Sequence, residues 1–183
     1  NYILKNSSYC ITVSNQEFKD CNSIIKDKNK IKQIPNGFVA NDFLELPISD
    51  FIKKNNLTNK KIILALGRMD PIKGFHLLIE AFSNISQTAK DWQLVFIGPD
   101  NDYRKKLINR ANELECKSSI TFLDPHYGEE KRMAYYSCDL FVIPSLFDAM
   151  TIVAVEAAAC GKPILITNTS DFPGLILNKG GIE

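Results

Sequence analysis

The chain has 183 residues, 45% hydrophobic and 23% charged, a composition that is typical of a globular protein and excludes a disordered or collagen-like chain. The length suits one domain, or one domain with a short appendage. Lys and Arg number 22 against 21 Asp and Glu, so the net charge is +1 and gives no electrostatic case for general nucleic-acid binding, which relies on a concentrated basic face.

The first 45 residues differ in pattern from the rest. A strand is predicted at 10–14 and a helix at 16–25, followed by a sharp turn at Pro35-Asn36-Gly37, because Asn-Gly tolerates positive φ. The chain begins at Asn1 without a signal-peptide pattern, and we expect a piece of a longer protein. Residues 1–37 are predicted to be the tail of a preceding N-terminal domain and a linker. Residues 38–183 then form the main domain, without its final helices.

The cysteines and the charge pattern near the N-terminus indicate where the protein works. The five cysteines show no CxxC spacing, which argues against a disulfide framework or a zinc site and favours reduced thiols; they are Cys10, Cys21, Cys116, Cys138 and Cys160. No apolar run approaches the length of about 20 residues that a membrane span needs. Alternating lysines at 26, 28, 30 and 32 favour a solvated face over a lipid contact. We expect a cytoplasmic protein and leave open peripheral contact with the inner face of the membrane.

Short apolar runs alternate with amphipathic segments from residue 62 onward. Phe75, Leu78, Ile79 and Phe82 form one stripe of a helix, and further helices are expected near 103–116, 129–137 and 152–160. The apolar runs are typical of strands that are covered on both faces, and they lie at 62–66, 94–97, 120–123, 140–143 and 164–166. This alternation predicts an α/β fold with a Rossmann-like, doubly wound parallel sheet.

The loop after the first of these strands, Gly67-Arg68-Met69-Asp70-Pro71-Ile72-Lys73-Gly74, places two cations beside the start of a helix. Ligands of parallel sheets bind at the carboxyl ends of the strands, and Arg68 with Lys73 suits a diphosphate there. The loop is neither a Walker A motif nor a GxGxxG turn. A solvated cationic turn is the alternative.

A second candidate follows the strand at 140–143. Asp148 stands at the entrance of a helix and Glu156 lies eight residues on, so both carboxylates can line one side of a groove. The segment 152–159 is otherwise wholly apolar and is expected to be buried on all sides, so a charge in it needs a partner or a ligand such as the diol of a ribose. The alternative is Asp148 as a helix cap and Glu156 as a surface residue.

Other polar residues carry weaker signals. Asp100-Asn101-Asp102 is a DxD tripeptide, but after Gly98-Pro99 and before a helix a turn and cap role is favoured, and no metal site is predicted. His126 and Tyr127 follow the strand at 120–123 and either flank a base or fill a loop. His76 is expected in packing or at the surface. No nucleophile–base arrangement of a hydrolase is in view.

With these residues assembled, the chain resembles the C-terminal, nucleotide-sugar-binding domain of retaining GT-B glycosyltransferases of the group 1 (family 4) type. The resemblance runs over nearly the whole chain in the family's order. It rests on 34–37, 67–74, 120–123, 136–145 and the segment from Asp148 to Pro163.

The resemblance implies a role for each candidate residue. Arg68 and Lys73 would hold the donor diphosphate, and Glu156 would hold the ribose hydroxyls. Asp148 would contact the transferred sugar, and His126 would lie beside the base. Backbone amides would face the sugar and phosphates at Met150, Thr151 and Ile152.

The implied reaction is sugar transfer from a nucleotide-diphosphate sugar to an acceptor hydroxyl, with retention and without an obligatory metal or cofactor. The acceptor, a glycan or a lipid-linked glycan in surface-polysaccharide synthesis, would bind through the N-terminal domain, so the fragment alone is expected to be inactive. The sequence departs from the family in Asp148 for Glu, Thr151 for Gly and Asp124 for Gly. The alternatives are a nucleotide-sugar epimerase and a non-catalytic binding module; the absent glycine fingerprint argues against a dinucleotide-dependent oxidoreductase.

Overall fold

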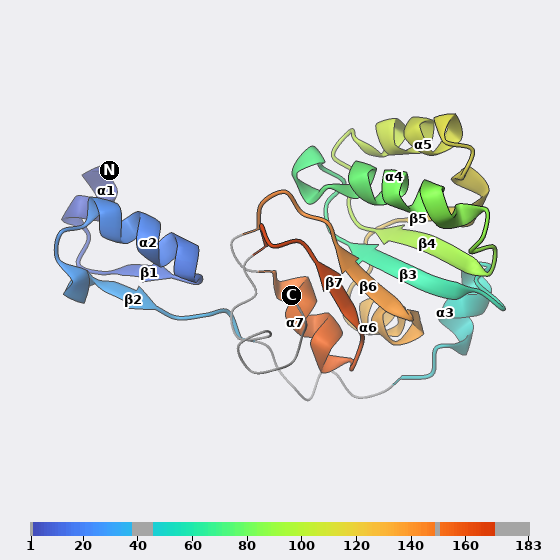
Figure 1. Cartoon of the computed structure of the whole chain (residues 1–183). Coiled ribbons are helices and arrows are strands. Elements are labelled where there is room, and N and C mark those ends of the chain that lie inside the picture. The colour runs from blue at the N-terminus through green and yellow to red at the C-terminus, as the bar shows by residue number, and fades with distance from the viewer. Residues whose placement is uncertain (1, 38–45, 149–150, 171–183) are drawn as a thin grey trace.

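The computed structural model describes residues 2–37, 46–148 and 151–170, and a five-stranded parallel sheet forms its centre (Figure 1). The order is β5-β4-β3-β6-β7, so the chain runs outward from β3 to β5 and then crosses back to β6. The strands are β3 (Lys61–Leu66), β4 (Trp92–Ile97), β5 (Ile120–Leu123), β6 (Leu140–Ile143) and β7 (Ile164–Ile166). The predicted Rossmann-like, doubly wound fold is confirmed, and its topological switch point lies between β3 and β6.

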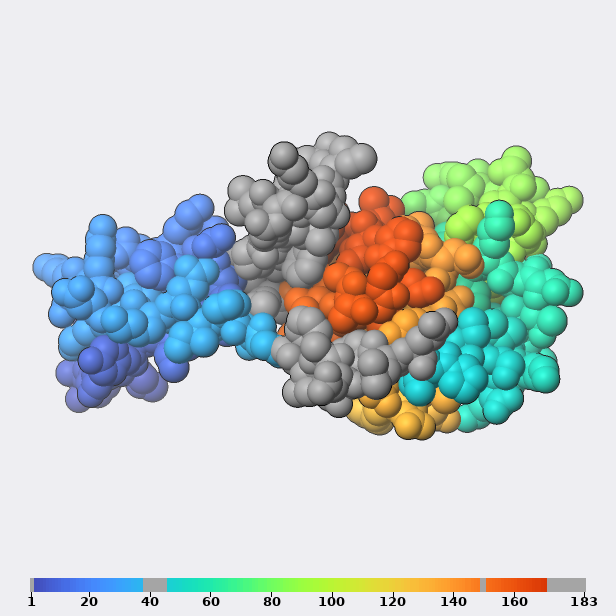
Figure 2. All heavy atoms as spheres, turned by 90° about the horizontal axis from the view of Figure 1, so that it is seen from below, coloured from blue at the N-terminus to red at the C-terminus, as the bar shows by residue number. Residues whose placement is uncertain are grey.

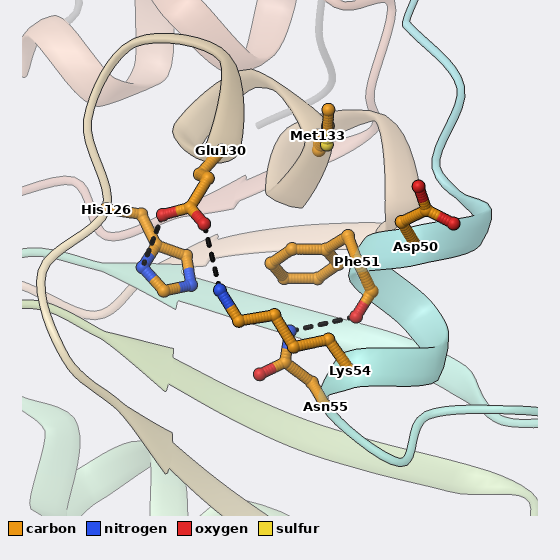
Figure 3. A pocket seen from close by; sticks show the side chains of 7 residues that line it. All are labelled: Asp50, Phe51, Lys54, Asn55, His126, Glu130 and Met133. Carbon is orange, nitrogen blue, oxygen red and sulfur yellow. Dashed lines mark hydrogen bonds and ion pairs between the residues drawn. The ribbon is translucent and has the colours of Figure 1, made fainter.

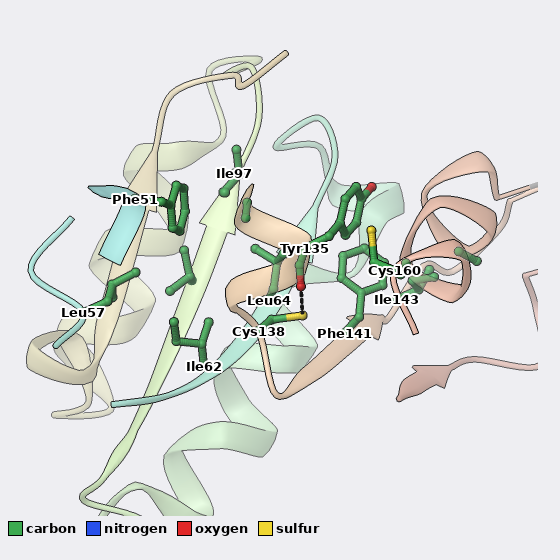
Figure 4. Packing of buried hydrophobic residues seen from close by; sticks show 14 residues of the cluster. Phe51, Leu57, Ile62, Leu64, Ile97, Tyr135, Cys138, Phe141, Ile143 and Cys160 are labelled. Atoms are coloured by element: carbon green, nitrogen blue, oxygen red, sulfur yellow. Dashed lines mark hydrogen bonds between the residues drawn. The ribbon is translucent and has the colours of Figure 1, made fainter. Parts of the chain in front are cut away.

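Helices cover both faces of the sheet, which explains the nearly continuous apolar runs. In β3, Ile62 and Leu64 join the core on one face, whereas Ile63 and Ala65 join the core on the other. The first core is shared with α3 (Ser49–Lys54), α6 (Gly128–Ser137) and α7 (Ile152–Ala159) (Figure 4). The second is shared with α4 (Phe75–Ser86) and α5 (Arg104–Glu113). No described helix combines the length and the apolar composition that a membrane crossing requires.

The helix patterns were predicted with unequal success. The apolar stripe of α4 is buried as expected. The expectation that α7 is buried on all sides is wrong, because only Ala154 and Ala157 are buried and Ile152 is 46% exposed. A helix of small residues beside the edge strand β7 packs one narrow face on the sheet and leaves its other side accessible.

Residues 2–37 form a separate β–α–β unit with its own two-stranded parallel sheet, at one end of the molecule (Figure 2, blue). Ser14 caps α2, and the predicted strand and helix at 10–14 and 16–25 are present, with revised bounds. The unit comprises α1 (Tyr2–Asn6), β1 (Cys10–Thr12), α2 (Asn15–Ile24), η1 (Lys28–Lys30) and β2 (Ile31–Gln33). That this unit belongs to a preceding domain stays a prediction, and 38–45 and 171–183 lie outside the described residues.

Two glycines permit close backbone contacts at the carboxyl end of the sheet. A Cβ on Gly98 would overlap the carbonyl oxygen of Gly67, so the loops after β3 and β4 can touch only without a side chain there. A Cβ on Gly74 would overlap the carbonyl oxygen of Pro144, which brings the loop after β3 against the loop after β6. Gly74 also has φ +66°, a left-handed conformation that favours glycine.

We predict that Gly74→Ala destabilises the protein far more than Gly161→Ala. Gly161 has nearly the same backbone angle, φ +68°, but a Cβ there meets nothing within 4 Å. Both variants pay the left-handed strain of about 1–3 kcal/mol, and only Gly74→Ala adds the overlap with Pro144. Urea unfolding should give Gly74→Ala a free energy of unfolding at least about 2 kcal/mol below that of Gly161→Ala. Equal losses would show that the two loops do not approach as described.

Candidate nucleotide-sugar site

Several candidate residues lie at the carboxyl ends of the central strands, on the switch-point edge where ligands of open α/β sheets bind. A pocket there is lined by residues of the segments that follow β3, β4 and β5. Its polar and loop lining includes Gly67, Arg68, Gly98, Pro99, His126 and Lys131.

The loop after β3 is built to hold Arg68 at this pocket. The neighbouring Met69 is fully buried, and its backbone N–H donates to the carbonyl of Pro99 at 2.9 Å. Asp70 caps the short helix η3 (Pro71–Lys73) by accepting from the Ile72 N–H at 3.0 Å. The side chain of Arg68 is exposed on the pocket wall and has no ion-pair partner among the described residues. Its guanidinium is therefore available to an anionic ligand.

Lys73 and Asp148 form one ion pair across the switch point. The Lys73 Nζ lies 2.6 Å from Asp148 Oδ2, and both side chains are largely buried, 23% and 17% exposed. The two loops are joined by the Leu146 N–H, which donates to the Ile72 carbonyl at 2.8 Å. The structure thus brings together two of the predicted residues, but Lys73 is neutralised by Asp148 and is not a second free cation beside Arg68.

Glu156 is held by two side chains of α6. The Lys131 Nζ lies 2.8 Å and 2.6 Å from its two carboxylate oxygens, and the Tyr135 hydroxyl donates to Oε2 at 2.6 Å. Only 15% of the Glu156 side chain is exposed. The sequence predicted that this carboxylate needs a partner or a ligand, and in the structure Lys131 and Tyr135 are its partners.

The protonation state of Tyr135 fixes the direction of that bond. Burial, together with the charge and hydrogen bond of Glu156, raises the pKa of the Tyr135 hydroxyl far above its usual value. The hydroxyl therefore stays protonated and donates a hydrogen bond to the carboxylate. Because the Tyr135 ring is packed in the core (Figure 4), its hydroxyl holds the Glu156 carboxylate in a fixed position.

Lys131 and Tyr135 were not predicted from the sequence. Lys131 connects Glu156 to the pocket of Arg68, since it lines that pocket and pairs with Glu156. A signal was available: the two residues stand four apart on α6, so they share one helix face, and that helix follows the strand at 120–123.

His126 stands between this pocket and a neighbouring one, which Figure 3 shows from close by. Its ring meets Phe51 edge-on at 5.9 Å between centroids, and its Nδ1 lies 3.9 Å from Glu130. Lys54 binds Glu130 at 2.9 Å and, with a smaller effect of His126, lowers the pKa of that carboxyl. His126 is thus at the pocket wall, whereas Tyr127 is 76% exposed at its rim.

The start of α7 is described only in part. Thr151 is buried, and its Oγ1 has no hydrogen-bond partner among the described residues, while Ile152 begins the helix. Met150 lies outside the described residues. His76 meets the Tyr103 ring edge-on at 6.3 Å, which is a packing contact away from the pocket lining.

The first aspartate of the DxD tripeptide forms hydrogen bonds to backbone N–H groups at the start of α5. Asp100 Oδ1 accepts from the N–H groups of Tyr103 and Arg104, which is the expected turn and cap role. In the described part of the chain no cluster of three potential metal ligands occurs. Arg104 binds Asp124 at 2.9 Å and donates to the carbonyls of Gly98 and Leu123, so it fastens the ends of β4 and β5.

A second pocket lies on the far side of Asp148. It is lined on one side by Asn15, Gln16 and Lys19 of α2, and on the other by Phe147, Asp148 and the segment 168–170. Asp148 therefore faces the carboxyl end of the small sheet as well as the carboxyl end of the large one.

The chain is similar to glycosyltransferases. A family model described as "Glycosyl transferases group 1" matches residues 48–181. A lipopolysaccharide 1,2-N-acetylglucosaminetransferase of Salmonella typhimurium is 26% identical over 155 residues, which cover 79% of this chain and 40% of that protein. An uncharacterized glycosyltransferase of Methanocaldococcus jannaschii is 30% identical over 179 residues, covering 94% and 45%. The chain thus spans less than half the length of these relatives.

Solved structures share the fold. A sucrose-phosphate synthase from Thermosynechococcus elongatus matches with a TM-score of 0.80 and 26% identity, over 96% of this chain and 44% of that one. HepE of Anabaena, in complex with UDP and glucose, matches with a TM-score of 0.81 and 24% identity, over 90% and 45%. The parallel sheet is therefore arranged as in these GT-B structures.

We predict that Tyr135→Phe lowers the free energy of unfolding by about 1–2 kcal/mol, because Glu156 loses a buried donor while the packing of the ring is kept. The matched control is Tyr127→Phe, whose exposed hydroxyl should be dispensable. Chemical denaturation of both variants measures the difference. A Tyr135→Phe protein as stable as the control would mean that the Tyr135–Glu156 bond does not support the fold.

Proposed function

The chain belongs to the group 1 glycosyl transferases, and we propose that it forms the donor-binding part of a retaining, metal-independent hexosyltransferase. The donor is a nucleotide-diphosphate sugar, and the sugar passes to an acceptor hydroxyl. The observation that carries the proposal is the position of Lys131, which lines one pocket with Arg68 and binds Glu156. Lys131 thus connects the pocket of the cationic loop to the carboxylate of Glu156, which supports a single donor site.

Arg68 contributes the charge for the diphosphate. Its guanidinium is exposed at the pocket and unpaired among the described residues, and charge-assisted bonds from arginine to phosphate oxygens are strong. In transfer, negative charge develops on the departing diphosphate, and a preorganised cation stabilises it most in that state. Lys73 also contacts the diphosphate once a hydroxyl of the ligand binds Asp148 in its place.

Glu156 binds the ribose hydroxyls and His126 borders the base. A carboxylate has lone pairs for several donors, and Lys131 with Tyr135 holds this one in place for the two ribose hydroxyls. The pocket wall near His126 is largely apolar, which suits the flat face of a base.

Asp148 contacts the transferred sugar, together with the backbone amides of Met150, Thr151 and Ile152 at the start of α7. Support comes from the pocket that Asp148 shares with α2, because amide, hydroxyl and carboxylate groups with an exposed phenylalanine suit a carbohydrate. We also propose that residues 1–37 are the tail of the N-terminal acceptor domain and a linker. The chain alone then binds the donor but does not catalyse transfer.

The acceptor is a glycan or lipid-linked glycan of a surface polysaccharide, and the protein works in the cytoplasm at or near the inner membrane face. The name of the Salmonella relative, a lipopolysaccharide enzyme, agrees with this class of acceptor.

We predict that nucleoside diphosphates raise the melting temperature of the wild type and that Glu156→Ala removes the rise. UDP, GDP, ADP and their sugars are screened, each variant against its own unliganded melting temperature. The control Glu80→Ala removes an exposed carboxylate that pairs with Arg110 on α4 and α5, and should keep the full shift. An unchanged shift in Glu156→Ala would remove Glu156 from the site. A wild type that binds none of the nucleotides would contradict the function.

A further inference from the structure

Two of the five cysteines lie in sulfur contact within the small β–α–β unit. The Sγ atoms of Cys10, at the start of β1, and Cys21, in α2, are 3.5 Å apart. Both residues are partly exposed and both thiols are free. Their separation of eleven positions gives no hint of this in the sequence, where the absence of CxxC spacing argued against disulfides.

The contact follows from the local fold. Cys10 and Thr12 of β1 point toward α2, whereas Ile11 between them is exposed. The turn into α2 is fixed by two hydrogen bonds that resemble a capping box: Ser14 Oγ accepts from the Glu17 N–H at 3.1 Å, and the Glu17 carboxylate accepts from the Val13 N–H at 2.8 Å. Strand and helix are thus held in the register that keeps the two sulfurs together.

The other three cysteines are in a different situation. Cys116, Cys138 and Cys160 are buried in the cores of the large sheet. Burial raises the pKa of the Cys138 thiol to about 12, so little thiolate forms there at ordinary pH. They serve as internal controls for any reaction of Cys10 and Cys21.

We propose that Cys10 and Cys21 are a redox modification site that forms a reversible intramolecular disulfide by exchange with a low-molecular-weight disulfide such as oxidised glutathione. Neither cysteine is among the residues that line the pocket of Arg68 or the pocket of Asp148. To form the bond, the sulfurs need to close from 3.5 Å to a bond length of about 2.05 Å.

The exchange has two balanced steps. One protein thiol loses its proton, and its thiolate attacks the oxidant, forming a mixed disulfide and releasing one glutathione thiolate, which takes up a proton. The second protein thiol loses its proton and attacks the protein sulfur of the mixed disulfide, which releases the second glutathione. Two protein thiols are oxidised, and the oxidant's disulfide is reduced to two thiols. Burial and the neighbouring Cys10 raise the pKa of Cys21, so the exchange is faster in mildly alkaline solution.

The test equilibrates the full chain with mixtures of oxidised and reduced glutathione at about pH 8.5, then alkylates the remaining thiols and maps the peptides by mass. We expect one bridge, between Cys10 and Cys21, with Cys116, Cys138 and Cys160 alkylated once the quenched protein is unfolded. Cys10→Ser and Cys21→Ser should each give no bridge and stop at a mixed disulfide.

The same measurement in concentrated urea separates the fold from simple chain proximity. The effective concentration of the two thiols should be at least about tenfold higher in the native protein than in urea, because the fold holds them together. Equal values in the two conditions would overturn the proposal. A wild type that stops at a mixed disulfide, or that bridges other cysteines, would overturn it as well.

Discussion

A carboxylate on a helix that packs against an apolar sheet needs a partner, and Glu156 finds its partners on the neighbouring helix α6. Tyr135 belongs to the core, and Lys131 belongs to the wall of the pocket at the strand ends. One hydrogen-bonded group therefore joins core, helix α7 and pocket. The proposed donor site depends on this group, because it places a rigid acceptor for hydroxyls next to a cationic loop.

The rest of the site follows from how closely three loops approach at the switch point. Gly98 lets the loop after β4 touch the loop after β3, and Gly74 lets that loop touch Pro144 after β6. The Lys73–Asp148 pair then forms across this seam. The pair neutralises two groups that we assign to the donor, so a donor that contacts either group has to replace an internal partner.

The sheet and most helices could be predicted from the sequence, because the spacing of apolar residues and the length of apolar runs reflect which faces of an element are buried. The loops after parallel strands led to Arg68, Lys73 and Asp148 as candidates, and the lone charge in the apolar segment 152–159 led to Glu156. The sequence did not reveal that Lys73 pairs with Asp148, because contacts 75 positions apart depend on tertiary packing. It overestimated the burial of α7, since alanines suit a half-covered edge helix as well as a buried one. The sulfur contact of Cys10 and Cys21 was missed because it depends on the geometry of the β1–α2 turn, which the spacing of the two cysteines does not indicate.

The most direct test of the account compares a nucleoside diphosphate that binds the wild type with the corresponding nucleoside, by NMR titration of the wild type and Arg68→Met. The account predicts that Arg68→Met weakens binding of the diphosphate at least about tenfold, the value of one charge-assisted bond, and leaves binding of the nucleoside unchanged. The control Lys61→Met removes a cation at the opposite end of β3 and should change neither. Equal binding of the diphosphate by wild type and Arg68→Met would contradict the claim that the cationic loop and Glu156 hold two parts of one ligand.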